Sequence, residues 1–130
     1  MSTQLIIKLF LRISIAFSFL SAVADRLGLW KSEISVWGNW DSFVAYTEVI
    51  NPWFPNSIIP IIAILATVAE VFLAIGLLIG YKTELFAKLS GLLLLLFAIA
   101  MTFSTGIKGA FDYSVFTAAA AAFALNIIRG

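Results

Sequence analysis

The chain of 130 residues contains no cysteine and no histidine. Disulfides, thiolate-bound iron-sulfur clusters, the usual axial ligation of haem and ordinary zinc sites all need one of these side chains, so none of them is expected within this chain. Charge is also scarce, because only 12% of the residues are Asp, Glu, Lys or Arg, against about 25% in an average soluble domain. The net charge of +1 gives no extended basic surface, so nucleic acid is not expected as a partner.

The sequence also lacks a nucleotide-binding loop, a metal-ligand spacing and a catalytic triad. A serine in a chain without histidine has lost its usual general base. Any redox role would therefore need a bound diffusible carrier or a partner protein. We assign no catalytic residue and no metal ligand from the sequence, and whether the chain belongs to an enzyme stays open.

Hydrophobic residues, in contrast, make up 62% of the chain and form four long runs. A helix rises ~1.5 Å per residue, so about 20 residues cross the ~30 Å hydrocarbon core of a bilayer. The last apolar run begins only at Tyr113 and must draw in Ala110 to Asp112 to reach that length. The sequence predicts an all-α integral membrane protein, a four-transmembrane-helix bundle in a single membrane domain over residues 1–130. The predicted spans are residues 5–24, 58–79, 85–103 and 110–128.

The longest segment between spans, residues 26–57, holds every tryptophan of the chain. Tryptophan favours the headgroup zone, where its ring is in apolar surroundings and its N–H finds a partner. Within residues 30–53, aromatic and aliphatic side chains recur at helical spacing from Trp37 to Ile50, which predicts a short interfacial helix that ends before Pro52. We interpret the tryptophans as an interfacial belt, with a lid over a site between the helices as the alternative. They are Trp30, Trp37, Trp40 and Trp53.

The basic residues near the span ends favour one orientation in the membrane, because cytoplasmic flanks carry an excess of Lys and Arg. Four spans would put five basic residues on the side of both termini and three on the other side. The sequence therefore predicts a multi-pass protein of the cell (inner) membrane with both termini cytoplasmic. The first group is Lys8, Arg12, Lys82, Lys88 and Arg129, and the second is Arg26, Lys31 and Lys108.

Glu70 is the one carboxylate within the second predicted span, on a face of small residues that also carries Thr67. Counting from the span ends puts Arg12 about 10 Å and Glu70 about 13 Å from the inner boundary. A buried charge needs a partner, so we predict an intramembrane Arg12–Glu70 ion pair as a candidate ligand-binding site, with Thr67 and Thr102 beside it. The alternative is that Arg12 reaches the headgroups with Lys8 and that burial keeps Glu70 neutral.

A second group of charges collects at the predicted outer ends of spans one and four. It consists of Asp25, Arg26, Lys108 and Asp112. We predict an outer polar cluster there, and the alternative is an ordinary solvated rim.

Polar landmarks within these spans carry a resemblance over nearly the whole chain. They are Leu11-Arg12-Ile13, Ala24-Asp25-Arg26-Leu27-Gly28, the Tyr46–Pro52 segment, the Ala69–Gly80 segment and the Asp112–Thr117 segment. With them the chain resembles the DoxX-like family of small four-helix membrane proteins, named for the DoxD and DoxX proteins associated with thiosulfate:quinone oxidoreductase. The resemblance implies a four-helix bundle and links to quinone-coupled sulfur oxidation, oxidative-stress complexes or assembly of other membrane proteins.

Three functions stay open at this point. The first is a non-catalytic membrane module that binds a partner protein, a lipid or a quinone through the bundle and the Trp-rich segment. The second is a membrane subunit of a quinone-linked oxidoreductase, with quinone near Arg12 and Glu70. The third is a proton or small-solute conduit through Glu70, Thr67 and Thr102. The lipid bilayer is the expected partner of each, a membrane or redox partner protein and a homo-oligomer stay open, and quinone is the one cofactor considered.

Overall fold

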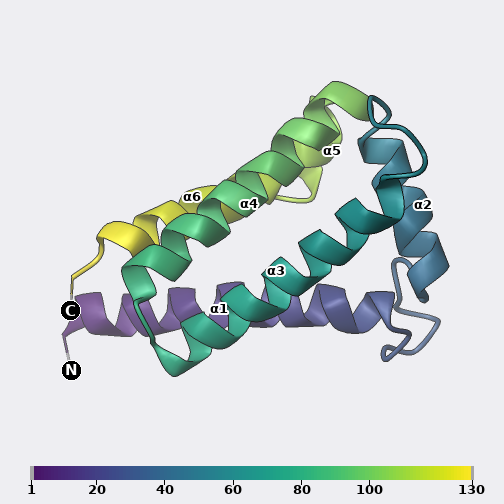
Figure 1. Cartoon of the computed structure of the whole chain (residues 1–130). Coiled ribbons are helices and arrows are strands. Elements are labelled where there is room, and N and C mark those ends of the chain that lie inside the picture. The colour runs from purple at the N-terminus through teal and green to yellow at the C-terminus, as the bar shows by residue number, and fades with distance from the viewer. Residues whose placement is uncertain (1, 130) are drawn as a thin grey trace.

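The computed structural model describes residues 2–129, and over that range it consists of helices and turns without a strand (Figure 1). The all-α prediction is confirmed. Three helices are long and apolar enough to cross a membrane: α1, α3 and α4. The six helices are α1 (Thr3–Arg26), α2 (Trp40–Ile50), α3 (Ile59–Ile79), α4 (Thr83–Ser104), α5 (Ile107–Asp112) and α6 (Val115–Ile127).

The predicted fourth span, residues 110–128, is wrong as one continuous helix. A turn at Tyr113 and Ser114 divides it into α5 and α6, and Ser114 takes a left-handed backbone conformation with φ 58°. Asp and Ser side chains compete for backbone hydrogen bonds, which disfavours both in a helix interior and favours a break here. The 13 residues of α6 extend only ~20 Å, less than the ~30 Å core. Within residues 2–129, three helices and not four meet the length of a span.

The helices pack chiefly in two pairs, α1 with α3 and α4 with α6. Figure 1 shows that α1 and the α4–α6 pair converge at the end where α1 begins and α6 ends, and that they diverge toward the opposite end. There, α2 runs between them and also contacts α3. The tight turn between α3 and α4 lies at the converging end, so these two helices meet closely there and leave space further along.

Two glycines set how closely the long helices approach one another. A Cβ atom on Gly76 of α3 would lie 2.3 Å from the ring of Phe86 in α4. A Cβ atom on Gly91 of α4 would lie 2.8 Å from the ring of Phe123 in α6. Both separations are shorter than any side chain tolerates, so each ring packs directly on backbone, and a larger residue at either glycine would push the helices apart.

The prediction that the small-residue face of α3 points inward is confirmed. Ala63 and Ala74 are fully buried and Glu70 is 2% exposed. Val68 and Phe72, on the other face, are each 61% exposed. The helix therefore presents its carboxylate to protein and its large apolar side chains to the surroundings, as a membrane-spanning helix does.

The short helix predicted between the first and second spans is α2, and it begins three residues later than expected. Asn39 caps it by accepting a hydrogen bond from the Ser42 amide at 2.8 Å. Its apolar stripe buries Phe43 and Ile50 together with Thr47. Trp37 lies in the preceding loop, where its ring contacts the start of the helix. The face of α2 that turns inward closes the wide end of the space between the long helices.

Candidate functional site

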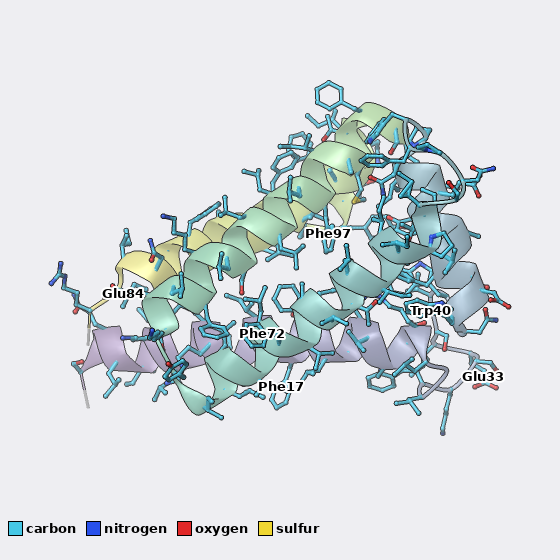
Figure 2. All side chains as sticks on the ribbon, in the orientation of Figure 1. Phe17, Glu33, Trp40, Phe72, Glu84 and Phe97 are labelled. Atoms are coloured by element: carbon cyan, nitrogen blue, oxygen red, sulfur yellow. The ribbon has the colours of Figure 1, made fainter. Side chains whose placement is uncertain are left out.

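A cavity of about 1060 Å³ lies between the long helices and is closed at one end by α2. Side chains from α1, α3, α4 and α6 line it, and most of them are apolar. Figure 2 shows Phe97 of α4 at the gap between α3 and α4. The cavity exists because α3 and α4 diverge from their turn, so the side chains between them do not fill the widening space.

The polar end of this cavity is a buried ion pair between α1 and α3. Arg26, in the last turn of α1, donates from Nη1 to Oε2 of Glu70 and, at 2.9 Å, to Oγ1 of Thr67. Each side chain of the ion pair is only 3% exposed. A buried charge without a partner is strongly unfavourable, and two opposite buried charges compensate each other. The pair therefore fixes α1 against α3.

Aromatic rings from the loop and α2 cover the guanidinium. Arg26 Cζ lies 3.8 Å from the ring centroid of Phe43 and 5.3 Å from that of Trp37. The two rings meet edge to face with centroids 5.0 Å apart. The face of an aromatic ring attracts a cation, so these contacts help to hold the guanidinium in place.

Several polar atoms of this end form no hydrogen bond within the described range. Arg26 Nε and Trp37 Nε1 are buried without a partner. Arg26 Nη2 and Glu70 Oε1 take no part in the hydrogen bonds of the pair, which use Nη1 and Oε2. All three residues line the cavity. Because buried donors and acceptors are normally satisfied, this end has spare hydrogen-bonding capacity.

The predicted Arg12–Glu70 pair is wrong, because the partner of Glu70 is Arg26. Arg12 instead donates from Nε to the Leu77 carbonyl at 2.8 Å and from Nη2 to the Leu78 carbonyl at 3.1 Å. These carbonyls belong to the last turn of α3, where carbonyl groups lack an amide donor within the helix and the helix dipole favours a cation. The antiparallel register of α1 against α3 puts Arg12 about two turns from Glu70, a distance that counting depth from the span ends missed.

Of the two threonines predicted beside Glu70, Thr67 is in the site and Thr102 is not. Thr67 contacts Arg26 and also donates to the Ala63 carbonyl at 2.8 Å. Thr102 donates to the Ala98 carbonyl of its own helix at 2.7 Å and does not line the cavity.

The predicted outer polar cluster is also wrong as one group. Lys108 pairs with Asp112 inside α5, where both side chains are exposed. Arg26 belongs to the buried pair. Asp25 accepts three backbone hydrogen bonds, from the amides of residues 36, 37 and 38 at 2.7, 2.9 and 2.8 Å. Its carboxylate therefore folds the loop back onto the end of α1, which brings the Trp37 ring to Arg26.

The four tryptophans do not share one role. Trp30 is exposed and donates to the Ser21 carbonyl at 3.1 Å, and Trp53 is half exposed at the cavity edge. Trp40 packs on the Phe43 ring with centroids 5.6 Å apart. Only Trp37 reaches the ion pair. The indoles thus belong partly to the molecular surface and partly to the site.

Sequence reasoning missed Phe43, Tyr46 and Thr47 of α2 as site residues. Thr47 is buried and all three line the cavity. Burial raises the pKa of the Tyr46 phenol, so it stays an uncharged hydroxyl at neutral pH. The spacing of Phe43 and Thr47 on the apolar face of α2 was the available signal, because that face had to cover something.

The length and apolar composition of α1, α3 and α4 fit a helical membrane protein. No protein-family model, no curated protein and no solved structure matches this chain. Its function therefore has to be argued from the cavity.

Proposed function

We propose that the chain is a membrane module that binds a small molecule from the lipid phase, a lipid or a quinone, in the cavity. The observation that carries the proposal is an apolar cavity of about 1060 Å³ whose one charged group, the Arg26–Glu70 pair, lies at one end. Binding sites for small molecules are typically ~300–1,000 Å³, mostly apolar, with a few convergent polar groups. An amphipathic molecule matches this layout, with its head at the ion pair and its tail along the long helices.

The exposed residues of the lining support entry from the side. Leu65 of α3 and Leu96 and Phe103 of α4 line the cavity and are 64%, 63% and 76% exposed. In a membrane these side chains would contact acyl chains. A ligand dissolved in the bilayer would pass between α3 and α4 without crossing water, so a lipid-phase molecule fits better than a polar solute.

The proposal includes a membrane topology. The short helices α5 and α6 together make the fourth crossing, as a helix interrupted at Tyr113 and Ser114, and α6 packs along α4. Both termini then share one side, which the basic flanks assign to the cytoplasm of a cell (inner) membrane. This arrangement agrees with the four-helix bundle that the DoxX-like resemblance implies.

A quinone-linked oxidoreductase subunit is the second candidate. A quinone is a lipid-phase molecule with carbonyl acceptors, and the unpartnered donors of Arg26 and Trp37 favour a head of this kind. The quinone would lie beside Arg26 and Glu70 and not beside Arg12. Its electrons would come from a partner protein.

Filling the cavity tests the proposal. Ala69 lines the cavity next to Glu70, whereas its neighbour Val68 is 61% exposed on the outer face. Native mass spectrometry of the protein purified in mild detergent would detect a bound small molecule. Ala69→Phe should abolish the binding of this molecule, and Val68→Phe should retain it. The same molecule at full occupancy on Ala69→Phe would contradict the cavity as its site. A wild-type protein that binds neither a native lipid nor an added quinone would refute the proposed function.

A further inference from the structure

We infer that the cavity selects a molecule with an uncharged head group, a hydroxyl or a carbonyl, and rejects a carboxylate or a phosphate. The inference rests on the proposed function and adds the chemical class of the head. It follows from three features of the Arg26–Glu70 pair: its charge balance, its free atoms and its aromatic cover.

The charges at the polar end of the cavity balance. Arg26 and Glu70 are the only Lys, Arg, Asp or Glu residues among the described residues that line the cavity. Because they neutralise each other, the polar end has no net charge to offer a ligand. An ionised head would bring an uncompensated charge against apolar walls, which is strongly unfavourable.

The free atoms of the pair suit a neutral head. Nη1 of Arg26 is already committed to Glu70 and Thr67, and Oε2 of Glu70 is committed to Arg26. Nη2 and Nε of Arg26 and Nε1 of Trp37 remain as donors, and Oε1 of Glu70 remains as an acceptor. A hydroxyl can accept from one of these donors and donate to Oε1, and a carbonyl can accept from a donor. A carboxylate or phosphate would meet the Nη2 donor and also the repulsion of the Glu70 oxygens.

Aromatic rings cover part of the Arg26 guanidinium. The ring centroid of Phe43 lies 3.8 Å from Arg26 Cζ, and the Trp37 ring is adjacent. The Phe43 ring therefore covers one face of the guanidinium, and Glu70 and Thr67 occupy Nη1 at its edge, so an anion finds neither free in the wild type. The site differs in this respect from an anion-binding arginine, whose planar fork is presented free to the ligand.

The experiment compares two probes with the same tail, a pyrene-labelled long-chain alcohol and the corresponding pyrene-labelled fatty acid, in mild-detergent micelles at a pH where the acid is ionised. Energy transfer from tryptophan to pyrene reports binding, and affinities are expressed per mole fraction of probe in the micelle. The wild type should bind the alcohol at least about tenfold more tightly than the acid. A long-chain quinone that displaces the alcohol probe would show that the same site also binds a carbonyl head.

Glu70→Gln removes the internal counter-charge and leaves Arg26 free for an anion, so this variant should prefer the acid. The double variant Arg26→Gln with Glu70→Gln is neutral again and should lose the preference for the acid. Asp112→Asn is the matched control, because it changes the net charge equally at an exposed pair outside the cavity, and it should behave as the wild type.

Equal binding of the two probes by the wild type, or tighter binding of the acid, overturns the inference and leaves the proposed function intact. A wild type that binds neither probe nor the quinone refutes the proposed function and the inference with it. The wild-type comparison decides the matter even if Glu70→Gln does not fold. Where that variant does fold, an unchanged preference for the alcohol refutes the role assigned to the pair.

Discussion

Replacing one member of the buried Arg26–Glu70 pair is expected to cost more stability than replacing both. Each single change, Arg26→Met or Glu70→Leu, leaves a buried charge without its partner, which costs ~3–5 kcal/mol. Arg26→Met also loses the contact of the guanidinium with Phe43, at 3.8 Å from the ring centroid, worth ~0.5–2 kcal/mol. That contact is lost in the double variant as well, so it cancels from the coupling. The double variant should therefore be more stable than the sum of the single changes implies, by at least ~3 kcal/mol.

The assay is a double-mutant cycle on the free energy of unfolding in mixed micelles, with unfolding driven by a denaturing detergent. The exposed Lys108–Asp112 pair in α5 provides the control cycle, and its coupling should not exceed the ~0.5 kcal/mol typical of exposed i,i+4 pairs. Single changes at Arg26 and Glu70 that add within ~0.5 kcal/mol would show that the two charges are satisfied independently. That result would remove the pair as the unit that holds α1 against α3.

Three further predictions concern other parts of the molecule. Arg12→Met should lower the free energy of unfolding by ~1–3 kcal/mol, because two carbonyls at the end of α3 lose their donor. The control Lys8→Met should change it little. Unfolding in detergent measures both variants, and equal effects would contradict the capping role of Arg12. Asp25→Asn should speed hydrogen exchange at the loop amides that the carboxylate binds by about tenfold, and unchanged protection would refute its role in holding the loop. Single cysteines at Ser2 and Ser35 should react with a membrane-impermeant reagent from opposite sides of the membrane, and labelling from one side would exclude the proposed topology.

The parts of the fold that follow from chain length and periodicity could be predicted from the sequence. The positions of α1, α3 and α4 follow directly from apolar runs of about twenty residues. A helix needs about that length to cross the bilayer core. The inward face of α3 could be predicted from the helical period of the sequence, because Glu70 shares its face with Ala63 and Ala74. The start of α2 was misplaced by three residues because Trp37 continues the apolar period, although Asn39 was available as a cap.

The predictions that were wrong concern backbone turns and helix register, which chain length and hydropathy do not determine. The interruption at Ser114 lies within an apolar run, and hydropathy does not register a backbone turn. The wrong partner for Glu70 has a similar origin, since equal depth is a statement about two axes parallel to the membrane normal. In the fold, α1 and α3 are antiparallel with a register that puts Arg12 at the end of α3. The side chain of Arg26 then reaches Glu70 from the last turn of α1.

The charged side chains of the cavity lining come from α1 and α3, and this division bears on how a ligand would be recognised. Asp25 and Arg26 are neighbours in one turn of α1: the first holds the loop that carries Trp37, and the second pairs with Glu70 beneath that ring. Loss of either would therefore loosen the same polar end. The helices α4 and α6 bring no charged side chain to the lining and contribute apolar surface. Substitutions in the first group should change which head group binds, whereas substitutions in α4 and α6 should change the fit of the tail.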